Sequence, residues 1–274
     1  MKRFRTTYAI AMIAAAALSG CGAPDGIGPP PPPPQDPVLL KDVVIDHLPA
    51  PFYHFDYDAA GRVRAVSFAS DLRQYDITYS GDRISELTNN VPVNHDRLQY
   101  IYDDAGRVGI VLYVNSTGTF THVVFTYDGP KLIKVERDRR VDGGFIIDKT
   151  MTIAYDADGN LHRLSVHRPA IEGVQDETTT VDTYEQYDTG INVDGFALIH
   201  DEFIDHLVLL PGVQLQRANP RRETRTGDGL NYVVDYTYSY DDRNRPQTKT
   251  GALLIQNGQQ AGQTIQTLSQ FTYY

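Results

Sequence analysis

Residues 57–63 read Tyr-Asp-Ala-Ala-Gly-Arg-Val, and this short stretch decides the fold because it recurs along the chain. Its copies stand at residues 79–84 (YSGDRI), 102–108 (YDDAGRV), 127–132 (YDGPKL), 155–161 (YDADGNL) and 240–246 (YDDRNRP). The first five copies begin 22 to 28 residues apart. A repeat of this length indicates a body assembled from many copies of one supersecondary unit.

Each copy combines a strand pattern with a turn pattern. Before the turn, apolar side chains occupy alternate positions, as at Tyr53, Phe55 and Tyr57, so all three lie on one face of a β-strand. The aspartate can accept hydrogen bonds from the turn backbone, and the glycine takes the left-handed conformation that reverses the chain. A second apolar run, such as residues 108–114, follows the turn. Each unit is therefore predicted to be a β-hairpin, and Asn244 tolerates the glycine's conformation in the last copy.

Successive hairpins with short links predict an all-β chain in which an antiparallel meander forms one large twisted, curved sheet. A single hairpin cannot bury its aromatic face alone, so neighbouring hairpins must join a common sheet. We expect about a dozen strands. The sequence leaves open whether the sheet closes into a barrel.

One region departs from the hairpin pattern. Apolar residues at positions 196, 199, 203, 204, 207 and 208 follow helical spacing, and Pro211-Gly212 ends the run. The spacing predicts one short amphipathic helix near residues 195–210 that covers a face or an end of the sheet.

The first twenty residues have the composition of an export signal. Three basic residues among the first five precede an apolar run at residues 8–18, which is shorter than the roughly 20 residues that a membrane-spanning helix needs. The run ends in Leu-Ser-Gly-Cys at residues 18–21, which resembles the lipobox of bacterial lipoproteins. The resemblance implies cleavage before Cys21 and attachment of diacylglycerol and palmitate to that cysteine. Gly22, in place of aspartate, favours the outer membrane; which face of it the body occupies stays open.

These features divide the chain into a signal peptide (1–20), a lipidated cysteine with a proline-rich tether (21–40) and a single β-hairpin-repeat domain (41–274). Six consecutive prolines at residues 29–34 favour polyproline II and predict a spacer of roughly 20 Å between the lipid headgroups and the body. A ligand for a proline-binding module is the alternative interpretation. Because Cys21 is the only cysteine, its acylation leaves no thiol for a disulfide, a nucleophile or a metal ligand.

The charge balance disfavours nucleic acid as a partner. The formal net charge is −10, and it becomes −13 without residues 1–20, which hold three basic and no acidic residues. An acidic surface repels a phosphate backbone.

The Tyr-Asp-x-x-Gly-Arg-apolar unit resembles the YD repeat of RHS-type proteins, which stack very many copies into a shell around a toxin. This chain has too few copies for such a shell and lacks a C-terminal toxin segment. It is more similar to a family of Gram-negative lipoproteins with a domain of unknown function, which join a lipobox to four or five hairpins. That family also has a segment like residues 187–196 (YDTGINVDGF) and a final strand like residues 236–241 (YTYSYD). The resemblance covers about residues 50–274 and implies an architecture, not an activity.

The patterns that could carry chemistry are weak, and we predict no catalytic residue, cofactor or metal ligand. Residues 156–160 (DADGN) begin like a calcium loop, but Leu161 and His167 occupy the positions of its glycine and its final carboxylate. The acid pairs at 103–104 and 241–242 belong to turns. Carboxylates on different strands could still converge into a glycosidase-like pair.

The densest polar cluster is residues 200–206 (HDEFIDH). His200, Glu202 and His206 could form a metal or acid–base site, but the two histidines are six residues apart and diverge on a helix. We interpret the cluster as the solvated side of the predicted helix. Rows of tyrosine could stack on sugars, although their register with the strands favours the core.

The sequence therefore favours a non-catalytic cell-envelope lipoprotein with a binding or scaffold role toward an unidentified protein, glycan or apolar molecule. One alternative is a carrier, like the half-barrel chaperones of the periplasm, which predicts a cavity lined by apolar side chains. A less favoured alternative is a hydrolase, which predicts acids that converge in a cleft.

Overall fold

The computed structural model describes residues 38–91, 95–141, 143–200 and 207–274. The compact unit runs from Val38 to Tyr274. Cys21, the signal peptide and the proline-rich tether up to residue 37 lie outside the described residues. Within the described ranges, no helix is long and apolar enough to cross a bilayer.

The described residues of the unit form sixteen strands. They are β1 (Leu40–Ile45), β2 (Tyr53–Tyr57), β3 (Val63–Phe68), β4 (Arg73–Ser80), β5 (Arg83–Asn89), β6 (Arg97–Tyr102), β7 (Val108–Asn115), β8 (Gly118–Asp128), β9 (Lys131–Val141), β10 (Gly144–Tyr155), β11 (Leu161–Arg168), β12 (Thr178–Glu185), β13 (Arg222–Gly227), β14 (Tyr232–Tyr240), β15 (Pro246–Ile255) and β16 (Thr264–Tyr273).

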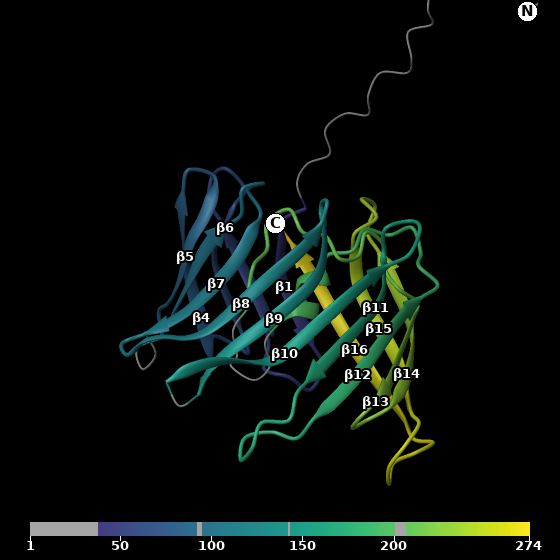
Figure 1. Cartoon of the computed structure of the whole chain (residues 1–274). Helices are drawn as coiled ribbons and strands as arrows, with labels where there is room; N and C mark the ends of the chain where they lie inside the picture. The colour runs from purple at the N-terminus through teal and green to yellow at the C-terminus, as the bar shows by residue number, and fades with distance from the viewer. Residues whose placement is uncertain (1–37, 92–94, 142, 201–206) are drawn as a thin grey trace, which may run out of the picture. The chain divides into compact units, whose positions relative to one another are not determined.

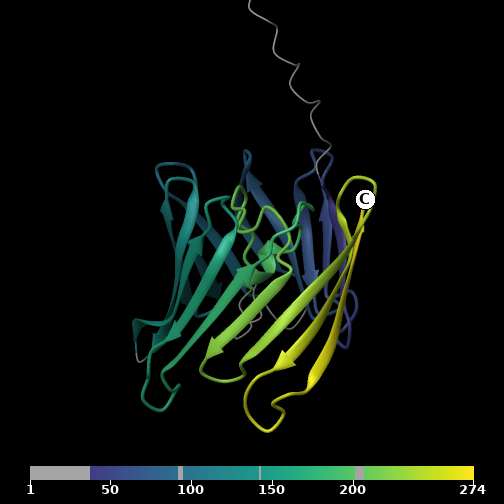
Figure 2. The same ribbon diagram turned by 90° about the vertical axis from the view of Figure 1, so that its right-hand side faces the viewer.

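Each strand pairs antiparallel with its neighbours in the sequence, which confirms the predicted all-β meander. The sequence left the closure of the predicted curved sheet open, and the structure decides it: β1 pairs with β16, so the sheet closes into a barrel (Figures 1 and 2). Val43 lies opposite Phe271 at this junction, and the hydroxyl of Thr272 donates to the carboxylate of Asp42. Closure satisfies the backbone groups that two open edge strands would leave unpaired.

The aspartate–glycine motifs form the hairpin turns, as predicted. In the first copy, one carboxylate oxygen of Asp58 accepts from the backbone N–H groups of Ala60 and Arg62, at 2.9 and 3.0 Å. Gly61 adopts a φ of 75°. In the last copy Asn244 takes the same role with a φ of 61°. Residue identity in the motif therefore follows from the backbone geometry of the turn.

In five of the six copies, the tyrosine that begins the motif bonds to a backbone carbonyl of the preceding hairpin or strand, whereas the Tyr240 hydroxyl of the last copy donates to the Asp188 carboxylate. The Tyr102 hydroxyl donates to the backbone carbonyl of Ile84 at 2.9 Å, and the Tyr127 hydroxyl does the same to Val108. The same bond recurs at Tyr57–Leu40, Tyr79–Val63, Tyr155–Leu132, Tyr187–Leu161 and Tyr273–Pro246. We call this repeated tyrosine–carbonyl bond the latch. It explains why the motif begins with tyrosine rather than phenylalanine.

The arginine of the motif completes the latch. The guanidinium of Arg107 is bonded to the carboxylate of Asp103 in its own turn, and it lies 4.5 Å from the ring centre of Tyr127 in the next hairpin. Arg62 repeats this arrangement over Tyr79 at 4.3 Å. A cation over an aromatic face is favourable. One motif thus shapes its own turn and contacts the following hairpin.

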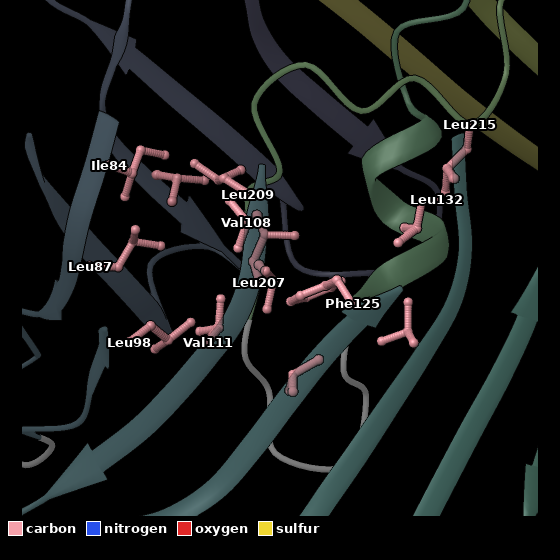
Figure 3. Packing of buried hydrophobic residues seen from close by; sticks show 14 of the residues in the cluster. Ile84, Leu87, Leu98, Val108, Val111, Phe125, Leu132, Leu207, Leu209 and Leu215 are labelled. Atoms are coloured by element: carbon pink, nitrogen blue, oxygen red, sulfur yellow. The ribbon is translucent and has the colours of Figure 1, made fainter. Parts of the chain in front are cut away.

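The connection between β12 and β13 enters the barrel, and we call it the plug (residues 186–221, described at 186–200 and 207–221). Its Phe196 ring lies 5.0 Å from that of Tyr53 and 5.1 Å from that of Phe55. The backbone N–H of Leu209 donates to the Tyr100 hydroxyl at 3.1 Å. Figure 3 shows plug side chains among those of the barrel wall.

The predicted helix near residues 195–210 is wrong in length and in place. A 3-10 helix covers only Gly195–Ile199, and residues 207–210 are not helical; the intervening residues 201–206 lie outside the described part. The side chains of Leu207, Val208 and Leu209 are all buried. Three consecutive side chains point in different directions, so burial of all three requires wall contacts on several sides. A segment inside a barrel has such contacts, whereas a helix on a sheet face has them on one side only.

Candidate binding site in the barrel lumen

The wall of the lumen changes character around its circumference. In the first ten strands most inward side chains are apolar and buried, as with Phe55, Leu98 and Val111. In β12 and β13 the inward positions instead carry charge, because Asp182 pairs in register with Arg225 and Tyr184 with Glu223. The plug packs against the apolar wall, as where the Phe196 ring meets those of Tyr53 and Phe55.

A cavity of about 390 Å³ lies between the plug and the strands β10 to β13. The plug contributes Ala197, Leu198 and His200 to its lining. The strands contribute Lys149, Met151, Leu164, Val166, Arg168, Thr178, Thr180, Asp182, Tyr184, Glu223 and Arg225. Cavities of roughly 300–1,000 Å³ with a few polar groups are typical of small-molecule sites.

The first fixed charge pair in this cavity is Asp182 with Arg225. The two side chains form a bidentate pair at 2.6 and 2.7 Å. The Asp182 side chain is 2 % exposed and that of Arg225 is 37 % exposed. The hydrogen bond from Arg225 to this carboxylate raises the pKa of the guanidinium above its ordinary value. The guanidinium therefore stays protonated, and Arg225 lines the cavity.

The second fixed group is the Glu223 carboxylate. It accepts from the hydroxyls of Tyr232 and Tyr236 at 2.8 and 2.7 Å. Burial is the main cause that raises the pKa of both tyrosines well above the ordinary value, so both remain neutral donors. Two neutral hydroxyl donors therefore hold the Glu223 side chain in place.

A third charged group lies on the inner side of β9 and β10, separated from β12 by β11. Arg137 and Asp148 are almost completely buried and form a bidentate pair with both distances at 2.8 Å. Arg139 adds a second cation, with its Nε 3.3 Å from the same carboxylate. A buried ion pair of this kind requires hydrogen bonds on both partners, and here they are present.

The three residues that the sequence offered as a metal or acid–base site can be checked only in part. Of His200, Glu202 and His206, only His200 lies in the described part. Its Nδ1 is 2.7 Å from the Tyr53 hydroxyl, and its ring is 4.7 Å from that of Phe68. The solvated-face interpretation of His200 is therefore wrong, because the plug is surrounded by the barrel wall.

The turn interpretations of the acidic motifs are confirmed. Asp156 accepts from the backbone N–H of Asn160 at 2.9 Å, and Asp103 and Asp241 make the matching contacts to Arg107 and Arg245. Among the described residues, no group of three or more His, Cys, Asp or Glu side chains is placed to hold a metal ion. The inward strand tyrosines form core, as with Tyr53 and Tyr100.

Sequence reasoning missed the cavity residues Asp182, Glu223 and Arg225. A signal was present, because β13 reads Arg-Glu-Thr-Arg-Thr-Gly at residues 222–227 and has no apolar side chain on either face. A strand of this composition inside a closed sheet must border water or polar groups. Without knowledge of closure, the same segment resembles an exposed edge strand.

No protein-family model and no curated protein matches this chain in sequence. Among solved structures, it is similar to a porin-like protein from Bacteroides uniformis ATCC 8492, with a TM-score of 0.56 and 14 % identity over 81 % of this chain and 89 % of that one. It is also similar to a porin-like protein from Bacteroides vulgatus ATCC 8482, with a TM-score of 0.57 and 15 % identity over 86 % of this chain and 99 % of that one. At these identities the likeness shows a shared barrel fold.

Proposed function

We propose that this chain is a non-catalytic lipoprotein of the bacterial cell envelope, anchored through Cys21, whose barrel lies in water beside the membrane and binds a ligand. One observation carries the proposal: in the strands β2 to β6, most apolar side chains point inward and most charged ones point outward. Transmembrane barrels have the opposite arrangement, with an apolar band toward lipid and a polar interior.

The strands β2 to β6 illustrate the direction of the alternation. Their outward positions align in rows across the wall and hold His54, Asp56, Arg64, Asp76, Thr78, Glu86, Thr88, Arg97 and Gln99. The inward positions between them hold buried residues such as Val66, Ile77 and Leu87. Aliphatic side chains do occur outside, as in the row Ile101, Ile110 and Val124, which continues to Glu136.

Ion pairs occur at several points around the outer wall. Arg97 and Glu86 are 3.5 Å apart between β6 and β5, and Lys134 and Glu136 are 2.8 Å apart on β9. Arg222 and Asp235 are 2.8 Å apart between β13 and β14. A basic residue that faces lipid near the bilayer midplane costs about 2–4 kcal/mol. The outer wall is therefore suited to water.

The plug favours binding over conduction. The solved structures similar to this chain are of porin-like proteins. In this chain the plug places buried side chains such as Leu207 and Leu215 in the lumen. The carboxylates of Asp182 and Glu223 both have hydrogen-bonded partners, which suits ligand recognition better than proton transfer. These features support the proposed non-catalytic binding role and the envelope location.

The anchor and the position of the barrel can be tested with one variant. The wild-type chain should incorporate labelled palmitate and sediment with the membrane fraction. Cys21→Ser should lose the label and appear in the soluble fraction without detergent, with a β-sheet circular dichroism spectrum. Gly22→Ala, which keeps the cysteine, is the control and should behave as wild type.

A different result would overturn the proposal. If Cys21→Ser stays in the membrane after a sodium carbonate wash, the barrel itself is embedded in lipid. If the wild-type chain incorporates no palmitate, the anchor assignment is wrong.

A further inference from the structure

We propose that the lumenal cavity binds a small anionic sugar, in which a carboxylate or phosphate is attached to a hydroxylated ring. This inference rests on the proposed binding role of the barrel and names the class of ligand. The cavity is the described space of about 390 Å³ between the plug and β10 to β13.

The charges of the lining favour an anion. Three cationic side chains, Lys149, Arg168 and Arg225, border the cavity together with two carboxylates. The carboxylate of Asp182 is bound to Arg225, while Lys149 and Arg168 reach the cavity from β10 and β11. Lys149 and Arg168 each also interact within the chain. The lining therefore carries one more cationic than anionic side chain, whereas the whole chain has a formal net charge of −10.

The polar groups between these charges suit hydroxyls. Thr178 and Thr180 stand at alternate positions of β12 and so share its inward face with Asp182. A threonine hydroxyl both donates and accepts, and a carboxylate accepts from a sugar hydroxyl. The Glu223 carboxylate is held by two tyrosine donors and has acceptor capacity left, because an ionised carboxylate has about four lone-pair sites.

An apolar surface completes the site. Leu164 and Val166 project into the cavity from β11 at alternate positions, and Leu198 faces it from the plug. Sugar rings have a face of C–H groups that packs on such a surface, while their rim of hydroxyls needs polar partners. A simple inorganic anion would use the cations alone and would leave this surface unused.

The cavity belongs to the end of the barrel where β11 and β12 are joined by residues 169–177. Arg168 ends β11 and Thr178 begins β12, so both flank that loop. Val174 in the loop is 49 % exposed, as is Leu230 in the neighbouring β13–β14 loop. The turns with the aspartate–glycine motif lie at the other ends of these strands. Ligand entry is therefore assigned to the loop end rather than the motif end.

The experiment is calorimetric titration of the full chain, purified in detergent from membranes, with three probes. D-glucuronate and D-glucose 6-phosphate carry the two possible anionic groups, and D-glucose is the neutral match. At least one anionic probe should bind, and D-glucose should bind at least tenfold more weakly. Which anion binds more tightly identifies the source of the negative charge.

The variant Arg168→Gln should weaken binding of the anionic probe by roughly tenfold or more, because it removes a charge-assisted hydrogen bond. Arg64→Gln removes an exposed arginine from the outer wall and should leave binding unchanged. If Arg168→Gln fails to fold, Thr180→Val decides instead. It keeps every charge and should weaken binding about threefold to tenfold.

Absence of heat with both anionic probes overturns the inference, as does equal affinity for D-glucose. An anionic probe whose affinity is unchanged in the folded Arg168→Gln variant, or in Thr180→Val where that variant decides, also overturns it. None of these results depends on membrane fractionation, so failure here is distinct from failure of the proposed lipid anchor.

Discussion

The two parts of the barrel wall differ in what they place in the lumen. The strands β1 to β11 carry five copies of the repeat and surround the plug with aromatic and aliphatic side chains. The strands β12 and β13 lack the repeat and present Asp182, Glu223 and Arg225 to the same lumen. The comparison teaches that the repeat builds most of the wall, and that the candidate site lies between the last of these hairpins, β10–β11, and the two strands that lack the repeat.

The largest expected effect on stability comes from removing a buried side chain from the wall that carries the repeat. Leu132 is fully buried on β9. Leu132→Ala should lower the free energy of unfolding by about 2–5 kcal/mol, because it removes buried methyl groups and leaves a void. Urea denaturation followed by circular dichroism measures this change.

The matched control for this variant is Leu254→Ala, at an outward position of β15 where the side chain is 42 % exposed. It should change the stability by less than about 1 kcal/mol. Equal effects of the two substitutions would contradict the inward direction of the apolar side chains.

A smaller effect is expected in the polar wall. Asp182→Asn should leave the Arg225 guanidinium without its carboxylate and lower the free energy of unfolding by about 1–3 kcal/mol. The lower part of the range applies because the Arg225 side chain is 37 % exposed.

The double variant Asp182→Asn/Arg225→Gln tests the cause of this loss. It should recover part of the stability, because it removes the uncompensated charge. If the double variant is as unstable as the sum of the two single variants, the ion pair is not the source of the effect.

The smallest effect is expected from a single latch. Tyr127→Phe removes the hydroxyl that donates to the Val108 carbonyl and should cost about 0.5–1.5 kcal/mol in the same assay. Burial raises the pKa of Tyr127 to about 12, so the hydroxyl of the wild-type residue is a neutral donor at ordinary pH.

The latch of the next hairpin gives a second test. The Tyr155 hydroxyl donates to the Leu132 carbonyl, and Lys131 lies near the Tyr155 ring. Tyr155→Phe should therefore give a loss of stability similar to that of Tyr127→Phe. No loss in either variant would show that the tyrosine hydroxyls do not stabilise the barrel.

The hairpins could be predicted from sequence because their signals are local. The Asp58 carboxylate and Gly61 act within one turn, and the alternation of Tyr53, Phe55 and Tyr57 follows from the geometry of one strand. The partner of the tyrosine hydroxyl could not be predicted, since Ile84 and Tyr102 are brought together only by pairing of neighbouring hairpins.

The plug was misjudged for the opposite reason. Its apolar residues repeat at helical spacing between positions 196 and 208, and this pattern normally indicates a helix with one buried face. Inside the barrel, burial is possible on every side, so Leu207 and Val208 are both buried without a helix. The contacts that surround the segment inside the barrel outweighed its local preference for a helix.

The amino-acid sequence by itself determined the hairpin unit, its turns and the antiparallel order of the strands, because these depend on contacts between residues close in the chain. Only the tertiary structure decided that β1 meets β16, that the plug lies inside, and that Asp182, Glu223 and Arg225 border one cavity. These outcomes depend on how the twist and register of sixteen strands add up, which no single strand encodes.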